Sequence, residues 1–545
     1  MVALNERVIA MLGSGLYKSR DRRATGSCRW GGIGCGLLIL PILGLLGLLP
    51  ASLAAAEWYV ALSGDNSAGT NWATAYTNLQ TAVDGAGADA VIYVKADTFG
   101  RTNQIDLSSK QNLRITGGYA GTAPEPGTLS ANYSVFARSS GNTRLFYGSA
   151  TTVTIERLTA ASGYINAHGA GMRFENGSAV TLSNVVIRNN TIPADDYGNM
   201  SRGAGLYISN GSLTAVDCRF DSNVMSYANW AARELGGGLY SENATTRLER
   251  SAFVGNYLYV KHYEAYGGAI YITGGSLIAS NCSFLSNGAT DGYAGSTAPY
   301  TYGGAIYLAA SVNPVVLYGS HFSVNYVGGI TATDRGGAVL FINGSTVNAM
   351  IEACSLEANN TGSAEEAVRI DAASSVVFCN SLISGSSDSA IQKAGAGRLV
   401  VTNCLFTSNA RHGVYTTAGT ATVVTATIAD NMGWGITNSS ATAVVSNCIV
   451  WNNTLGGIVN VSSVANTCDQ EVQGGTGNFT NNPRFFMGYY LASNGLSFQT
   501  DSSPCIDAGG DTAANLGLSG RTTRTDGIGD AGAVDCGYHY SNGVA

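Results

Sequence analysis

The chain reads Leu213-Thr-Ala-Val-Asp-Cys-Arg-Phe-Asp-Ser-Asn223 at one point and Val400-Val-Thr-Asn-Cys-Leu-Phe-Thr-Ser-Asn409 at another. In both stretches apolar residues alternate with polar ones, a Cys precedes a Phe by two positions, and an Asn follows the Phe by three. Alternation with a period of two predicts short, half-buried strands and not helices. The return of one pattern so far along the chain indicates internal repeats.

A Gly or Ala followed by an aliphatic residue marks each repeat from Gly171-Met172 to Gly457-Ile458, and the steps between these pairs shorten from 34 residues to 22. A unit of about 22 residues is too small to bury its own apolar face, so the copies must stack. We therefore predict an all-β parallel β-helix in which each coil adds about 4.8 Å. An Asn stands at a fixed place in every coil but that of Ser386: Asn190, Asn223, Asn256, Asn287, Asn325, Asn359, Asn409, Asn431 and Asn453.

The aligned columns give Asn and Cys separate roles. Each Asn amide can hydrogen-bond to the Asn of the next coil, which satisfies turn groups that would otherwise be buried without partners. Cys alternates with a small residue, so neighbouring thiols are two coils, about 9.6 Å, apart, beyond the roughly 7 Å limit for a disulfide. We predict that the thiols of this column are buried, free and unreactive. They belong to Cys218, Cys282, Cys354, Cys404 and Cys448.

Residues 1–56 have the pattern of a secretory signal peptide. Basic residues precede an uncharged run from Gly36 to Leu49, and Ala54-Ala55-Ala56 offers a cleavage site after Ala56. The run is shorter than the roughly 20 residues of a membrane span, although counting from Gly31 leaves an uncleaved anchor as an alternative. We expect an exported protein, extracellular or at a bacterial cell surface, without a membrane span after signal removal.

Motifs at both ends carry a resemblance to a known family. They include Trp58-Tyr-Val and Gly69-Thr-Asn-Trp72 near the start, and Ser503-Pro-Cys-Ile-Asp-Ala-Gly509 and Asp530-Ala-Gly-Ala-Val-Asp535 near the end. With them the chain resembles exported bacterial right-handed parallel β-helix repeat proteins of the pectate-lyase-like fold, and its C-terminal region is similar to the choice-of-anchor Q type. The resemblance implies a right-handed, single-stranded β-helix. The sorting signal usual after such a region does not follow Tyr540, which favours plain secretion.

We divide the mature chain into an N-terminal cap with the first coils (57–160), β-helix repeats with long loops on one edge (161–460), and a last coil with an irregular C-terminal cap (461–545). Asn78 can cap a short helix over 79–86 that covers the open end of the solenoid. Four cysteines lie outside the column. Of these, Cys505 and Cys536 are a candidate disulfide in the exported cap, and the pairing of Cys379 and Cys468 stays open.

Composition limits the partners. Charged residues make up only 12% of the chain, and the formal net charge is −7. With no basic stripe to neutralise phosphates, nucleic-acid binding is excluded. An apolar fraction of 45% also excludes a disordered chain.

The segment between each Asn and the next Gly or Ala varies most in length. It holds 14, 14, 12, 17 and 12 residues in five successive repeats and 3 in each of the last four. The long insertions therefore leave one edge on adjacent coils, as loops that mark a binding face. Their aromatic rings suit sugars, so we predict that a monomer binds a polysaccharide or cell-surface glycan; alternatively, the rings only pack the loops together. The predicted binding residues are Tyr197, Tyr227, Trp230, Tyr259, Tyr263, Tyr266 and Tyr293.

A polysaccharide lyase or glycoside hydrolase using the same face is the alternative function. A lyase needs a base and a hydrolase needs two carboxylates, but the signature clusters of polygalacturonases and pectate lyases are missing, which favours binding without catalysis. No cofactor is expected, although Asp526-Gly-Ile-Gly-Asp530 could hold Ca²⁺ if it is not simply a turn. The catalytic candidates are Lys261 or Arg233 as base, and Asp195 with Asp196, or Glu365 with Glu366, as carboxylates.

Overall fold

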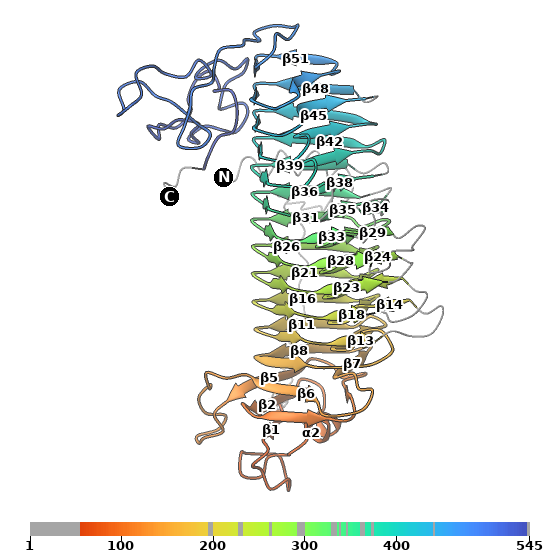
Figure 1. The fold of residues 1–545 in the computed structure, drawn as a ribbon. Helices are drawn as coiled ribbons and strands as arrows, with labels where there is room; N and C mark the ends of the chain where they lie inside the picture. The colour runs from red at the N-terminus through yellow and green to blue at the C-terminus, as the bar shows by residue number, and fades with distance from the viewer. Residues whose placement is uncertain are drawn as a thin grey trace, which may run out of the picture. The chain divides into compact units, whose positions relative to one another are not determined.

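The computed structural model describes residues 55–541 except 194–199, 227–232, 261–263, 292–299, 329–334, 337–338, 345–346, 360–365, 372–374 and 440–441. Three long parallel sheets run through these residues, with 15 strands in sheet A (β1 to β51), 14 in sheet B (β3 to β52) and 13 in sheet C (β4 to β50) (Figure 1). The predicted parallel β-helix is confirmed. Within the described residues no helix is both long and apolar enough to cross a membrane.

Each coil contributes one strand to each long sheet. In one coil these are β20 (Leu239–Glu242) in sheet C, β21 (Thr245–Glu249) in sheet A and β22 (Ala252–Val254) in sheet B. The next coil repeats them in register, with Leu239 beside Ile270 and Phe253 beside Phe284. In-register stacking places equivalent residues of successive repeats side by side in columns.

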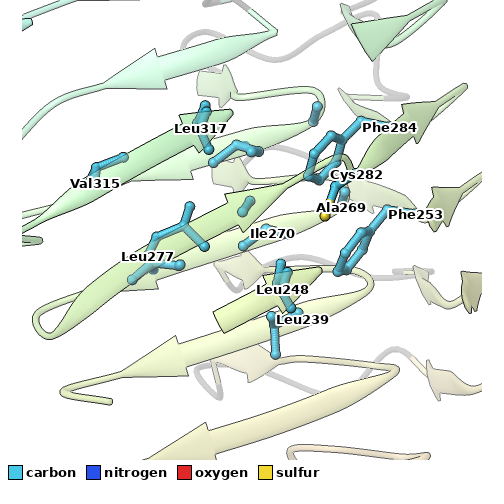
Figure 2. Close-up of a cluster of buried hydrophobic side chains, with 14 of the residues drawn as sticks. Leu239, Leu248, Phe253, Ala269, Ile270, Leu277, Cys282, Phe284, Val315 and Leu317 are labelled. Carbon is cyan, nitrogen blue, oxygen red and sulfur yellow. The ribbon is translucent and has the colours of Figure 1, made fainter. Parts of the chain in front are cut away.

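The inward columns form one continuous apolar core. The side chains of Phe220, Phe253, Phe284 and Phe322 stack with ring centroids 4.4, 5.3 and 4.5 Å apart. Figure 2 shows Phe253 and Phe284 beside Cys282 and aliphatic side chains of the neighbouring strands. Each such fully buried side chain contributes roughly 1.5–3 kcal/mol through removal of apolar surface from water.

The Asn column forms the predicted ladder. The Nδ2 of one Asn donates to the Oδ1 of the next at 2.8 to 3.1 Å along Asn190–Asn359 and again along Asn409–Asn453. Between the two runs, the backbone N–H of Ser386 donates to the Oδ1 of Asn409 at 3.0 Å. Each amide thus pairs the turn of its own coil with those above and below.

The Cys column is buried and its thiols are free, as predicted. Burial raises the pKa of Cys282 to about 11 and that of Cys404 to about 12. The suggested disulfide between Cys505 and Cys536 was wrong, because both are thiols in the structure. They meet through their backbones, with the Cys536 N–H donating to the Cys505 carbonyl at 2.9 Å, and their side chains join an apolar cluster.

Both ends of the stack are covered. Helix α2 (Leu79–Gly85) begins after Asn78, whose side chain accepts from the Gln80 N–H as predicted, and buries three residues in the core. At the other end the amides of Gln473 and Asn478 donate to carbonyls of the last coil, those of Ile458 and Val464, each at 3.0 Å. The chain itself therefore covers the apolar core at the first coil and pairs with two carbonyls of the last coil.

One repeat boundary differs from the sequence alignment by one residue. The pattern places Ala338-Val339 opposite Ala305-Ile306, but the structure pairs Ile306 with Leu340. Both Val339 and Leu340 are fully buried, so adjacent apolar residues hid the slip from a reading of the sequence. The later coils keep the predicted register, with Val368 opposite Ile391.

Replacing Asn287 by Ala should destabilise the fold by about 2–4 kcal/mol, because buried partners on both sides lose their hydrogen bonds. These partners are the backbone N–H and the side chain of Asn256, the amide of Asn325 and the carbonyl of Phe253. Denaturant unfolding measures the loss. Asn281→Gly is the control, since this exposed turn residue has φ of +53° and the next coil has Gly319 there. Equal stability of the two variants would contradict the ladder's role.

The five column thiols should resist a thiol reagent in the folded protein at pH 8 and react only on unfolding. Their burial keeps them protonated and out of reach, and thiolate is the reactive form. Mass spectrometry of the labelled peptides distinguishes them from Cys379, which is partly exposed. Rapid native labelling of Cys218 or Cys404 would show that the stacking places them wrongly.

Candidate functional site

The described residues of the five long insertions form strands, where the sequence suggested loops. They do leave the same edge on adjacent coils, as predicted (Figure 1). Together they build two further parallel five-stranded sheets, D and E, which we call the ledge. Sheet D holds β13 (Thr191–Pro193), β18 (Val224–Ser226), β23 (Tyr257–Val260), β28 (Gly288–Asp291) and β33 (Tyr326–Gly328). Sheet E holds β14 (Ser201–Arg202), β19 (Glu234–Leu235), β24 (Glu264–Tyr266), β29 (Tyr300–Tyr302) and β34 (Arg335–Gly336).

The ledge has an apolar core of its own. Alternate residues of sheet D point inward, so β23 buries Leu258 and Val260 while Tyr257 and Tyr259 stay half-buried. This alternation is why the insertions form strands, since a strand pair that buries one face gains apolar contact that a loop lacks. The buried cluster is separate from the main core and comprises Ala170, Ile192, Ala204, Met225, Leu258, Val260, Ala265, Ala289 and Val327.

Sheet E joins the ledge to sheet C through aromatic rings. Tyr266 lies 4.8 Å from Tyr307, and Tyr302 lies 4.7 Å from Phe341, between ring centroids. The predicted binding residue Tyr266 therefore serves packing here, the alternative that the sequence left open. It meets a stacked column on sheet C that the sequence reasoning missed: Tyr207, Tyr240, Tyr271, Tyr307 and Phe341, 5.2 to 5.3 Å apart. The signal was present, because each Tyr of this column directly follows the aliphatic residue of a repeat pair.

The other face of sheet D carries three tyrosines that we call the outer tyrosine patch: Tyr257, Tyr259 and Tyr326. Tyr257 lies 6.3 Å from Tyr259 and 6.1 Å from Tyr326 between ring centroids, and all three are half-buried. Gly288 stands between Tyr257 and Tyr326 in register. A Cβ at Gly288 would lie 2.4 Å from the Tyr326 ring, so only glycine allows this ring to lie flat against the strand.

Most of the predicted site cannot be placed. Of the binding residues, Tyr259 falls in the outer tyrosine patch and Tyr266 in the packing layer. Arg233 is described and forms an ion pair with Glu264 at the rim of the ledge, so its guanidinium is engaged. Glu366, one of the predicted carboxylates, is described as well. The remaining predicted residues lie outside the described part of the chain: Tyr197, Tyr227, Trp230, Tyr263, Tyr293, Lys261, Asp195, Asp196 and Glu365.

A polar cluster follows the ledge on the next coil. Glu366 is buried, and its Oε1 lies 3.9 Å from Nη1 of Arg369, whose Nε donates to Asp371 at 3.1 Å. Burial raises the pKa of Glu366 to about 7, and the charge of Arg369 opposes this rise. Asp388 of the following coil adds a second nearly buried carboxylate. A carboxyl group that is protonated near neutral pH has the property required of a general acid.

The acidic residues near the C-terminus do not share one cation site of the expected kind. Asp526 accepts from the Arg524 side chain and the Ile528 N–H, whereas Asp530 turns inward and bonds to Nε2 of His539 at 2.7 Å. Asp530, Asp535 and His539 have ligand atoms within 4.8 Å of one another. Hydrogen bonds already use this group. The backbone N–H of His539 also donates to Oδ1 of Asn403 at 2.6 Å, so it fastens the C-terminal region to the turn between β42 (Arg398–Thr402) of sheet A and β43 (Leu405–Thr407) of sheet B.

A comparison with protein families agrees with the fold. Residues 304–471 match a family model described as a right handed beta helix region, which spans β30 (Ile306–Leu308) to β52 (Cys468–Asp469). Among solved structures, a rhamnogalacturonan lyase is similar at 10% identity, with 76% of this chain and 87% of that chain covered and a TM-score of 0.29. No curated protein matches the chain. The fold of the described chain is a right-handed parallel β-helix.

Proposed function

We propose that the protein binds a polysaccharide on the outer face of the ledge, as a secreted or cell-surface binding protein or adhesin. The outer tyrosine patch is the observation that carries the proposal. Three neighbouring half-buried rings, with planes inclined by 28° and 38° to that of Tyr257, offer apolar surface and hydroxyl groups, which complement the apolar faces and hydroxyls of sugars. The leader-like residues 1–56 support a location outside the cell, where such a ligand would be met.

The patch rests on a stiff support. Every strand of sheet D pairs in register with its neighbours, and Tyr257 also bonds through its hydroxyl to Thr290. Rings that are held in place before binding lose little conformational entropy when a ligand arrives. A flat, repeating support also suits an extended ligand better than a small molecule enclosed in a pocket.

Replacing Tyr259 or Tyr326 by Ala should weaken polysaccharide binding about two- to tenfold each, the loss expected for one aromatic contact. Affinity electrophoresis of residues 57–545 against plant, algal and bacterial polysaccharides measures the effect. Tyr318→Ala is the matched control, because Tyr318 is 45% exposed on sheet A and belongs to neither sheet of the ledge. If all three variants migrate like the wild type, the patch is not the binding surface.

A glycoside hydrolase or lyase activity is the second candidate, and the buried Glu366 favours the hydrolase. Its raised pKa keeps the acid protonated up to about pH 7. Asp371 and Asp388 stand near enough to influence that pKa and are candidate second carboxylates. The cluster adjoins the C-terminal end of the ledge, so the bound polysaccharide could reach it.

If the protein is a hydrolase, Glu366→Gln should lower the release of reducing ends about 10²-fold or more, the usual contribution of a general acid. Wild-type activity should fall as the pH rises through about 7, because the acid must be protonated to act. Glu357→Gln, on β37 (Ser355–Glu357) of the preceding coil, is the control. An absence of products from every polysaccharide would leave binding alone, whereas full activity in Glu366→Gln would exclude Glu366 as the general acid.

A further inference from the structure

Glu234 is a carboxyl group enclosed in the apolar core of the ledge. On β19 it alternates with Leu235, which packs towards Tyr207 and Tyr240 of sheet C. Glu234 faces the opposite way and has 0% of its surface exposed. Among the described residues, neither of its carboxyl oxygens makes a hydrogen bond of ordinary geometry. In a chain whose buried Asn ladder is fully paired, such a group stands out.

Within the described part of the ledge, no cationic side chain forms an ion pair with Glu234. Along sheet E its register neighbours are Ser201 and Ala265. One coil further, the buried hydroxyl of Thr301 has no hydrogen-bond partner among the residues that the structure describes. The facing side chains of sheet D are apolar: Ile192, Met225, Leu258, Ala289 and Val327. The Glu234 carboxyl and this column are buried together between the two sheets of the ledge.

Charged groups nearby are directed elsewhere. Arg233 is exposed and paired with Glu264, and Arg202 lies over the ring of Tyr240 on sheet C. On sheet D, among the described residues, the charge of Glu234 acts on the phenol of Tyr257. Burial raises the pKa of this phenol, and the charge of Glu234 adds to the rise. Burial raises the pKa of Glu234 well above its ordinary value, and the backbone N–H of Tyr259 opposes this only in part.

We propose that Glu234 is a pH-sensitive latch of the ledge: sheets D and E stay packed together while its carboxyl group is protonated, and they separate locally when it ionises. An isolated carboxylate is strongly disfavoured in apolar surroundings, so ionisation requires water to reach it. Opening the ledge admits that water without disturbing the three long sheets, whose core is a separate cluster.

The direction of the pH effect follows from proton linkage. The closed ledge binds a proton at Glu234 that the open ledge releases above the ordinary glutamate pKa of about 4.3. Opening therefore becomes more favourable as the pH rises, by up to tenfold per pH unit between that value and the higher pKa of the closed form. Below about pH 4 the carboxyl group of Glu234 is protonated in the closed and in the open ledge alike. Opening then has no further pH dependence.

The latch would act on the outer tyrosine patch, a consequence that rests on the proposed function. Tyr257 and Tyr259 lie on β23, beside Leu258, which belongs to the core that Glu234 shares. Separation of the two sheets removes the support of this strand, so ligand binding should weaken at alkaline pH. The latch itself is testable without any ligand.

Hydrogen–deuterium exchange at matched pH values from 5 to 9, on full-length wild type and Glu234→Gln, tests the latch. Glutamine keeps the shape of the side chain and cannot ionise. In peptides covering β18, β19, β23 and β24, the ratio of wild-type to Glu234→Gln exchange should rise towards tenfold per pH unit. Comparison at one pH cancels the intrinsic pH dependence of exchange. Peptides from β16 (Ser212–Val216) and β21, in sheet A, should show a constant ratio.

Glu242→Gln is the matched control, because this half-buried glutamate pairs with Arg202 on the other side of sheet E and should leave the ratio flat. Glu234→Met, which removes the polar group, should behave like Glu234→Gln. The latch would be overturned by a ratio in the ledge peptides that stays constant with pH. It would also be overturned if both Glu234 variants exchanged faster than the wild type at every pH, or if the sheet A strands were unprotected from exchange in both variants. A failure to bind polysaccharide would overturn the proposed function and leave this result untouched.

Discussion

In-register stacking of equivalent residues at one coil spacing is the constraint on which the rest of the structure depends. Parallel strands about 4.8 Å apart bring each residue next to its counterparts above and below. A position can therefore be filled only by a side chain that tolerates its own copies as neighbours. Asn does so by donating from one amide to the next, Phe by stacking, and Cys by alternating with a smaller residue.

The same constraint explains the ledge. Five consecutive insertions are placed one above another by the coils, so their strands pair without any further folding information. Because the two resulting sheets bury a core together, the ledge resembles a small sandwich built onto the side of the solenoid. Its outer and inner aromatic rings consequently have different roles. Tyr266 and Tyr302 attach the ledge to sheet C, whereas Tyr257, Tyr259 and Tyr326 face away from that contact.

Much of this could be predicted from the sequence, because stacking turns structure into periodicity. The Asn ladder, the buried thiols, the helix behind Asn78 and the edge that carries the insertions all follow from the spacing of residues. The secondary structure of the insertions did not, since their lengths differ and no column is visible until the strands are paired. Glu234 was missed for a related reason: in a two-residue strand, nothing in the sequence tells which neighbour faces the core. Adjacent apolar residues hid the slip at Leu340 in the same way.

The amides of Gln473 and Asn478 at the end of the stack have a consequence for the assembly of whole chains. A β-helix whose last coil exposed its carbonyls would offer a template for the first coil of another copy, and fibres would follow. Here two side-chain amides donate to carbonyls of the last coil, and α2 covers the apolar core at the first coil. The two amides and α2 therefore occupy positions that an end coil of a second copy would need in order to stack on this one.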